Sequence, residues 1–260
     1  MTGQTVFISG GTSGINLGIA KGFCARGAKV MVFGRDADKA ERAAAEVREE
    51  TGGMAIAGTA DVRDYAAIAD LFTTSAAQLG APDVVIAGAA GNFMAPAVGI
   101  SANGFKTVVD IDLLGTYNVF RAAFDVVRKP GASLIAITAP QAVHPLPQQV
   151  HVCAAKAGVN MVVKVLAMEW GPAGIRVNAI SPGPIRGTEG VERMAPTEAD
   201  KEVWRSRTAI RRFGAAEDIA NAAIFLASPE GSYITGAILD CDGGMQLGDA
   251  SGDFLTPPGR

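Results

Sequence analysis

The stretch "TVFISGGTSGINLGIA", residues 5–20, decides the fold. Its apolar, β-branched beginning is typical of a buried strand, and its end has the pattern of an amphipathic helix. The glycines between them permit positive φ and let backbone N–H groups approach a phosphate at the positive end of the helix. An ordinary βα turn can also be rich in glycine, but this placement favours a dinucleotide site. The residues expected at the phosphates are Gly10, Thr12, Ser13, Gly14 and Ile15.

Asn16 stands where a third glycine is usual in such a turn. Asparagine tolerates the left-handed backbone conformation better than most residues. We therefore expect a slightly altered turn that still binds the phosphates.

Outward from this stretch, short apolar runs alternate with longer amphipathic segments. This rhythm predicts a single-domain α/β Rossmann fold, with a doubly wound, seven-stranded parallel sheet and helices on both faces. We expect one domain over 1–260, with a substrate flap at about 183–210 and an irregular C-terminal arm over 246–260. The predicted strands are 5–9, 29–33, 55–58, 83–87, 133–138, 176–180 and 237–240, and the predicted helices lie near 15–26, 37–50, 64–79, 101–127, 149–170 and 215–227.

Composition excludes several classes of protein. A net charge of −3 without a basic run argues against nucleic acid as a partner. The three cysteines, Cys24, Cys153 and Cys241, form no CxxC pair, so we expect buried thiols in a reducing compartment and no metal site. We find no apolar stretch of the roughly 18 residues that a membrane helix needs and no export signal at the N-terminus. The expected protein is soluble and cytoplasmic.

The end of the second predicted strand indicates the choice of cofactor. An acidic residue there would bind the adenosine ribose and repel a 2′-phosphate. The chain has Gly34 and Arg35 instead, and arginine offers a planar fork that suits phosphate. Arg35 could also be a solvated surface charge. We expect NADPH, with NADH as the weaker candidate.

Two further strand ends contribute to the same predicted site. Asp61 and Val62 end the third strand, where a carboxylate could accept a hydrogen bond from the adenine amino group. The run "AGAAG", residues 87–91, ends the fourth strand, and its small residues, Ala89 among them, would let the backbone approach the cofactor.

Together these features resemble the short-chain dehydrogenase/reductase family. The resemblance rests on the G-x-x-x-G turn, Asp61-Val62, "AGAAG", Lys156 and "SPGPI" (181–185), which occur in family order over about residues 4–245. It implies a nicotinamide cofactor whose ribose binds Lys156. It also extends the predicted cofactor site to Pro182, Gly183, Ile185 and Thr188.

The chain departs from that family at the proton-transfer residues. The family places a tyrosine four residues before the lysine, and a serine or threonine at the end of the fifth strand. The corresponding residues here are Val152 and Ala139, and neither can do that work. Thr138 is adjacent to Ala139 but would point to the other face of the strand.

This departure selects a branch of the family. "AAGNF" (89–93), "QVH" (149–151), "EWGPAGIRVN" (169–178) and "SPGPIRGTEG" (181–190) resemble the 2,4-dienoyl-CoA reductases of the peroxisomal type. That branch also lacks the usual tyrosine–lysine pair. The sequence ends in Pro-Gly-Arg and not in the branch's peroxisomal address, which is why we expect a cytoplasmic relative.

The chemistry of C=C reduction explains why a hydroxyl is dispensable. Alcohol oxidation needs a positioned base, because a hydroxyl proton must leave with the hydride. Adding hydride to a conjugated C=C bond moves charge to a thioester oxygen instead, so the site needs a hydrogen-bond donor and a source of a proton. We therefore expect reduction of a 2,4-dienoyl-CoA or a related enoyl thioester in fatty-acid metabolism, with Lys156 bound to the ribose.

Asp112 is the second expected catalytic residue. It stands where ordinary family members have an asparagine that holds a water near the lysine, and the resemblance implies a catalytic carboxylate. A carboxyl group beside an apolar pocket can stay partly protonated, and so donate a proton or orient a water. The alternative is a structural aspartate bound to the helix backbone. Asp110 ranks lower because it lies on another side of the helix.

The substrate is expected to contact residues that align with the family's substrate side. Arg63 and Arg193 could meet the phosphates of a CoA handle, or be solvated charges. The two histidines, His144 and His151, flank the active-site helix; a packing or capping role is the alternative to a direct one. The predicted substrate residues are Arg63, Phe93, Ser101, Asn103 and Arg193.

Two other functions remain open for this sequence. One is a carbonyl reductase or alcohol dehydrogenase with a non-standard proton donor, and the other is a non-catalytic NADP-binding protein. The resemblance further implies a homotetramer that pairs through 101–127 and 149–170, with a second contact at the last strand. The run 158–171 supports this because it is apolar on more faces than one sheet could cover.

Overall fold

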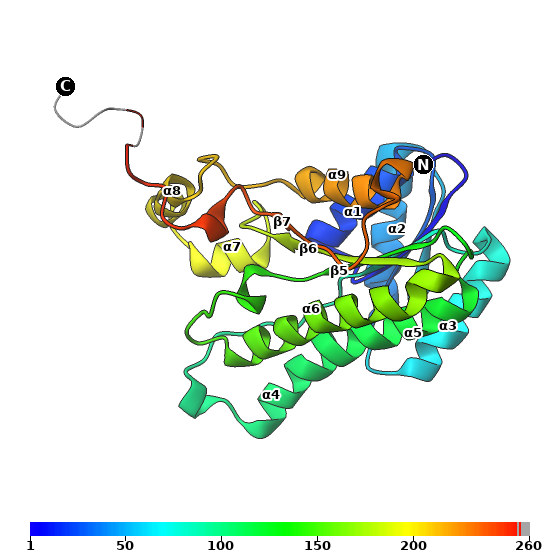
Figure 1. Cartoon of the computed structure of the whole chain (residues 1–260), viewed down its shortest axis with the longest axis horizontal. Helices are drawn as coiled ribbons and strands as arrows, with labels where there is room; N and C mark the ends of the chain where they lie inside the picture. The colour runs from blue at the N-terminus through cyan, green and yellow to red at the C-terminus, as the bar shows by residue number, and fades with distance from the viewer. Residues whose placement is uncertain (254, 256–260) are drawn as a thin grey trace.

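The computed structural model describes residues 1–253 and 255. Seven parallel strands form one sheet in the order β3-β2-β1-β4-β5-β6-β7, seen edge-on in Figure 1. This confirms the predicted doubly wound parallel sheet. The strands are β1 (Thr5–Ser9), β2 (Lys29–Gly34), β3 (Ala55–Thr59), β4 (Val84–Ala87), β5 (Ser133–Ile137), β6 (Arg176–Pro182) and β7 (Ile238–Cys241).

Helices cover both faces of the sheet (Figure 1). One face packs against α1 (Gly14–Cys24), α2 (Ala37–Thr51) and α9 (Ala216–Ala227). The other packs against α3 (Tyr65–Leu79), α5 (Gly115–Val126) and α6 (Val150–Trp170). The central strands are buried on both sides, which is why they are almost continuously apolar. Short 3-10 helices lie at Ala97–Gly99, Pro140–Ala142, Gly171–Ala173, Pro229–Gly231 and Met245–Leu247.

The strand order reverses beside β1. Ile8 of β1 pairs with Val32 of β2 on one side and with Ile86 of β4 on the other. The connections therefore leave β1 and β4 toward opposite faces of the sheet. In such folds the crevice beyond the carboxyl ends of these strands is the place where ligands bind. The glycine turn and the "AGAAG" run are both at this edge.

The predicted helix over 101–127 is wrong in one respect. It consists of α4 (Ala102–Val109) and α5, joined by a π-helical segment over Asp110–Leu114. Hydrophobic periodicity does not distinguish one widened turn inside a longer helix, so this turn could not be predicted from the sequence. Such turns occur frequently at functional sites.

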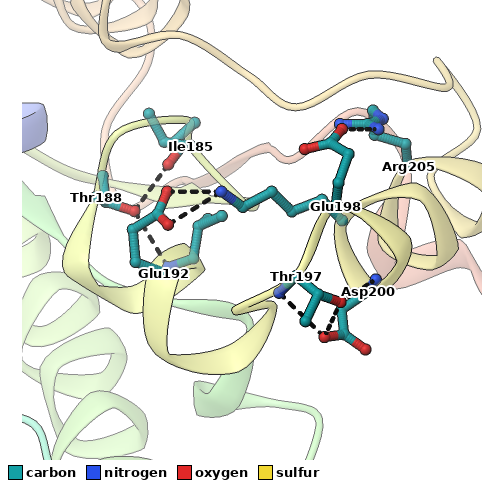
Figure 2. A network of polar contacts seen from close by, with 9 residues as sticks. Ile185, Thr188, Glu192, Thr197, Glu198, Asp200 and Arg205 are labelled. Atoms are coloured by element: carbon teal, nitrogen blue, oxygen red, sulfur yellow. Dashed lines mark hydrogen bonds and ion pairs between the residues drawn. The ribbon is translucent and has the colours of Figure 1, made fainter.

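The predicted flap contains two helices, α7 (Glu189–Met194) and α8 (Glu198–Arg207). Figure 2 shows their polar contacts: Thr188 caps α7, and Thr197 and Asp200 form a capping box at α8. Lys201 of α8 pairs with Glu192 of α7 at 3.0 Å. No described residue of α8 is buried. The segment therefore has the capping residues of a helix but not the buried apolar side by which a helix is predicted. The predicted C-terminal arm is described only over 246–253 and at 255; its other residues lie outside the described part.

Helix α6 contradicts the expectation that no apolar stretch of the chain is long enough to cross a membrane. By length and composition alone, Val150–Ala173 could cross a membrane, with a mean hydropathy of 1.4. In this fold the helix packs against β6, α4 and the π-helical segment, and Lys156 is buried within it. The core helix of a globular protein has the same composition.

Candidate active site

The glycine turn is shaped by a close approach of two strand ends. Gly10 and Gly14 have φ of +67° and +56°, which a residue with a side chain rarely adopts. A Cβ on Gly10 would lie 2.9 Å from the Cα of Ala89, in the run after β4. The predicted phosphate turn and the run after β4 are thus in van der Waals contact, and only glycine fits between them.

The start of α1 is open to an anion. Its N-cap residue, Ser13, makes no side-chain cap, and the first turn has no acidic residue. By contrast, Asp36 caps α2 and Asp64 caps α3 with side-chain oxygens. The unsatisfied N–H groups of α1 fit a pyrophosphate, because they combine free donors with the positive end of a helix.

Asn16 is present for a reason other than the one expected. Its backbone is helical and does not have positive φ. Its side-chain Nδ2 donates to the carbonyl oxygen of Gly88 at 2.8 Å, and a Cβ on Gly88 would overlap the amide. Asn16 therefore links α1 to the end of β4 by a hydrogen bond. A glycine at this position has no side chain and could not make that bond.

The adenosine end of the predicted site is a charged cluster. Arg63 donates to both oxygens of Asp61, at 3.0 and 2.6 Å, and lowers the pKa of that carboxyl. Arg35 also lowers this pKa by its charge, so it lies close to Asp61. Val62 is buried, and its carbonyl oxygen accepts from Asn118 of α5. Arg63 thus pairs with Asp61, the predicted adenine ligand, at this end of the site.

Asp112 and Lys156 form a buried ion pair beyond β4 and β5. Lys156 Nζ lies 3.2 Å from Asp112 Oδ2 and donates to the carbonyl oxygen of Ile137 at 3.1 Å. Asp112 Oδ1 accepts from the Gly91 N–H at 2.7 Å. The Oδ2 contact lacks hydrogen-bond geometry, so this oxygen can still accept a hydrogen bond. Both oxygens thus face donors, which fits the orientation of a water better than donation of a proton.

The π-helical segment places Asp112 at this point. Asp112 is 1% exposed, whereas Asp110 pairs with Lys106 on the outer side of the helix. Thr116 Oγ1 donates to the carbonyl oxygen of Asp112, one of the backbone groups in the widened turn. The structure therefore separates the two aspartates as predicted, by means of a turn that the sequence did not predict.

Within the described part of the chain, no hydroxyl bonds to the Asp112 carboxylate or the Lys156 ammonium. Val152 is apolar and 4% exposed. Ala139 has an extended backbone and lies two residues after Ile137, the last residue of β5. Thr138 is buried, and its Oγ1 has no hydrogen-bond partner among the described residues. The site therefore has an acid–amine pair without the tyrosine and serine of an alcohol dehydrogenase.

Phe93 lies at the edge of this site. Its ring centroid is 4.2 Å from that of His151, and a Cβ on Gly104 of α4 would lie 3.4 Å from its Cζ. His151 is fully buried, whereas His144 is exposed. Phe93 thus bridges the starts of α4 and α6, between two segments of the predicted substrate side.

The flap reaches the same loop through Arg193. Its Nη1 donates to the carbonyl oxygen of Asn92 at 3.1 Å. Asn92 Oδ1 in turn accepts from Gln149, a buried residue at the start of α6 that sequence reasoning missed. Ser101 caps α4 through the Gly104 N–H, and Asn103 is exposed on its first turn. Phe93, Ser101, Asn103 and Arg193 are thus all at one end of the site, and Arg63 is at the other.

Four of the predicted cofactor residues lie at the end of β6 or just after it: Pro182, Gly183, Ile185 and Thr188. Pro182 is the last residue of β6, and Thr188 Oγ1 donates to the carbonyl oxygen of Ile185 at 2.7 Å. Gly183 and Ile185 line a cavity of about 360 Å³ whose other wall includes Asp218. The Arg212 hydrogen bond lowers the pKa of Asp218 to about 2. Because neither Asp112 nor Lys156 lines this cavity, we do not assign it to the cofactor.

Residues 2–246 match the family described as Enoyl-(Acyl carrier protein) reductase. The chain is 38% identical to the Saccharomyces cerevisiae "Peroxisomal 2,4-dienoyl-CoA reductase SPS19 [(3E)-enoyl-CoA-producing]", over 98% of this chain and 88% of the relative. It is 39% identical to the Pongo abelii "Peroxisomal 2,4-dienoyl-CoA reductase [(3E)-enoyl-CoA-producing]", over 94% of this chain and 84% of that protein.

Solved structures show the same architecture. A short-chain type dehydrogenase/reductase from Mycobacterium ulcerans superposes with a TM-score of 0.90 at 30% identity, covering 96% of this chain and 92% of that one. A short chain dehydrogenase from Bacillus anthracis has a TM-score of 0.83 at 34% identity, with 98% and 99% of the two chains covered.

Proposed function

Because the chain belongs to the short-chain dehydrogenase/reductase family, we propose that it is an NADPH-dependent oxidoreductase that reduces a conjugated C=C bond of a 2,4-dienoyl-CoA or a related enoyl thioester. Its place would be in fatty-acid metabolism. The observation that carries this proposal is the buried Asp112–Lys156 pair beside Val152, with no hydroxyl at the two positions where an alcohol dehydrogenase needs one.

The residues divide the chemistry among them. Bound NADPH supplies the hydride. Lys156 holds the nicotinamide ribose with its ammonium group, and its bond to the Ile137 carbonyl fixes its position. Asp112 is held by the Gly91 N–H and keeps Oδ2 open to a hydrogen bond. A water on Oδ2 would be oriented to protonate the substrate carbon, because a fixed carboxylate sets the direction of its protons.

The similar proteins support this reading of the site. Two of them, from yeast and orangutan, are named as 2,4-dienoyl-CoA reductases that produce (3E)-enoyl-CoA. The same product would arise here from hydride addition at the far end of the diene and protonation beside the thioester. Arg193, already bonded to the Asn92 carbonyl, would meet the CoA phosphates by exchanging that partner.

The proposal is tested by measuring NADPH oxidation with a 2,4-dienoyl-CoA, a 2-enoyl-CoA and simple ketones in parallel. We expect turnover of the dienoyl thioester and none of the ketones. Turnover of ketones alone would establish the alternative carbonyl reductase with a non-standard proton donor. NADPH binding without turnover of any of the three would favour a non-catalytic NADP-binding protein.

The preference for NADPH rests on Arg35. It follows β2 directly, and its charge acts on Asp61 at the predicted adenosine site. Arg35→Ala should weaken NADPH by about 1.5–3 kcal/mol, the loss of a charge-assisted hydrogen bond, and should leave NADH nearly unchanged. This corresponds to roughly a 10–150-fold rise in the Kd for NADPH, measured by fluorescence titration.

Arg42→Ala is the matched control for this test, because Arg42 is also exposed and lies on α2. It should leave both Kd values unchanged. Equal weakening of NADPH and NADH by Arg35→Ala would show that Arg35 does not bind the 2′-phosphate.

We propose a homotetramer from the apolar surface of α6. Met161, Val165 and Met168 form one stripe on this helix, and Met168 is 81% exposed. Phe225 of α9 is also exposed, near the open edge strand β7. Light scattering at micromolar concentration should give four times the chain mass of 26.6 kDa. Met168→Glu should reduce that mass, because a charge cannot be buried unpaired in an apolar contact; a monomeric wild type would contradict the proposal.

The cellular location stays a prediction. We expected the cytoplasm, whereas the yeast and orangutan relatives are named peroxisomal enzymes. Imaging of the tagged chain in its own cell would distinguish the two.

A further inference from the structure

The imidazole of His151 is buried without a partner. The residue is 0% exposed, and neither Nδ1 nor Nε2 has a hydrogen-bond partner among the described residues. Removing a polar group from water without giving it a hydrogen bond is unfavourable, so natural folds rarely keep one. An unpartnered side chain this close to a candidate site therefore points to a partner that arrives with the ligand.

His151 lies one side chain away from the substrate side of the site. It is in the first turn of α6, next to Val152 and five residues before Lys156. Its ring packs on Phe93, with 4.2 Å between centroids, and Phe93 itself is 36% exposed. Phe93 is thus the boundary between the buried imidazole and the accessible surface. A shift of this ring would remove one of the contacts that bury His151.

The loop that holds Phe93 contacts three other parts of the site. The Gly91 N–H binds the Asp112 carboxylate, and the Asn92 carbonyl accepts from Arg193 of the flap. Phe93, the next residue, covers His151. Three consecutive residues therefore contact the catalytic pair, the flap and the imidazole, and a substrate that displaces Phe93 would act directly beside Asp112.

The proposed reaction needs a hydrogen-bond donor that the site has not yet supplied. Hydride addition to the far end of the diene moves an electron pair onto the thioester oxygen. Val152 and Ala139 have no side-chain donor, and both oxygens of Asp112 are acceptors. The Thr138 hydroxyl has no partner either, but alternation along the strand directs it to the face opposite Ala139. Lys156 is engaged by the Ile137 carbonyl and Asp112. His151 has a ring N–H with no acceptor.

We propose that the His151 ring N–H donates a hydrogen bond to the thioester oxygen of the bound acyl chain, which displaces the Phe93 ring to reach it. This inference rests on the proposed function. The hydride comes from NADPH, and the electron pair is held on the thioester oxygen beside His151. A proton from the water on Asp112 then adds to the carbon beside the thioester, which restores the C=O bond and leaves the 3-enoyl product. The hydroxide that remains takes up a proton from bulk solvent. His151 donates this hydrogen bond throughout the reaction and does not transfer its proton.

The first test compares two variants of His151. His151→Phe keeps an aromatic ring against Phe93 but removes the N–H, and should lower kcat for a 2,4-dienoyl-CoA at least tenfold; removing one such donor can lower kcat by about 10²–10³-fold. His151→Gln keeps an N–H and should recover part of that loss. Affinity for a saturated acyl-CoA should change less than the rate does, because the bond strengthens as charge develops. His144→Phe, at the exposed histidine, is the control.

The second test uses the wild-type chain, so it does not depend on how a variant folds. The chain has two histidines, which makes ring ¹⁵N NMR signals simple to assign with the aid of His144→Phe. Adding a saturated acyl-CoA to the NADP⁺ complex should shift the His151 ring signals and leave those of His144 in place.

The outcomes separate this inference from the proposed function. A wild type that reduces no dienoyl thioester contradicts the function itself. An active wild type whose His151 signals do not move, or whose His151→Phe variant keeps its kcat, overturns only the role of His151. Equal losses of kcat in the Phe and Gln variants would assign His151 to packing and also overturn it.

Discussion

Replacing Asp112 by asparagine is expected to lower the turnover of a 2,4-dienoyl-CoA by about 10²–10⁴-fold, the usual contribution of a group that positions a proton. Asparagine can still accept from the Gly91 N–H through its amide oxygen. Its NH2 group would then face the Lys156 ammonium, where the carboxylate Oδ2 now lies at 3.2 Å. The variant therefore keeps the shape of the site but loses the acceptor that would orient a water.

The measurement is kcat with a dienoyl-CoA, beside the Kd of NADPH for the same variant. The cofactor affinity should stay within a few-fold, because the glycine turn is untouched. Asp110→Asn is a close control: this carboxylate is two residues away and pairs with Lys106 on the outer side of the helix. If Asp112→Asn retained its turnover, Asp112 would be the structural aspartate that the sequence left open.

Replacing Lys156 by methionine is expected to destabilise the protein by about 3–5 kcal/mol, the loss that follows when one member of a buried ion pair is removed. Lys156 and Asp112 are 6% and 1% exposed, so the remaining carboxylate would be buried without its counter-charge. Only its bond from the Gly91 N–H would remain. NADPH binding should weaken as well, because the ribose loses its ammonium partner.

The double variant Lys156→Met/Asp112→Asn isolates the electrostatic part. It should be clearly more stable than Lys156→Met alone in urea denaturation at fixed protein concentration, because no uncompensated charge is left. NADPH binding should stay weak in both. Lys164→Met, at an exposed lysine on the same helix, should change stability by less than about 0.5 kcal/mol. If the double variant were no more stable than Lys156→Met, the stability lost in Lys156→Met would not come from the uncompensated charge of Asp112.

The sequence by itself determined the architecture, because strands buried on both faces must be nearly continuously apolar and helices must present one apolar side. It also indicated the phosphate turn, since few residues other than glycine adopt the backbone at Gly10 and Gly14. The absence of hydroxyls at Val152 and Ala139 needs no structure to be seen, and it already argued against ordinary alcohol chemistry.

Only the tertiary structure decided which polar groups meet. Asp112 and Lys156 are 44 positions apart in the chain, and a π-helical turn without a periodic signature puts one beside the other. Asn16 was expected to bend a turn and instead binds the Gly88 carbonyl. Arg63 was predicted to contact the substrate, and only the structure shows that it pairs with Asp61. The sequence left the roles of both histidines open, and only the structure shows that His151 is buried against Phe93. Local patterns report which face of an element is apolar, but the partner of a polar group is fixed by how distant elements pack.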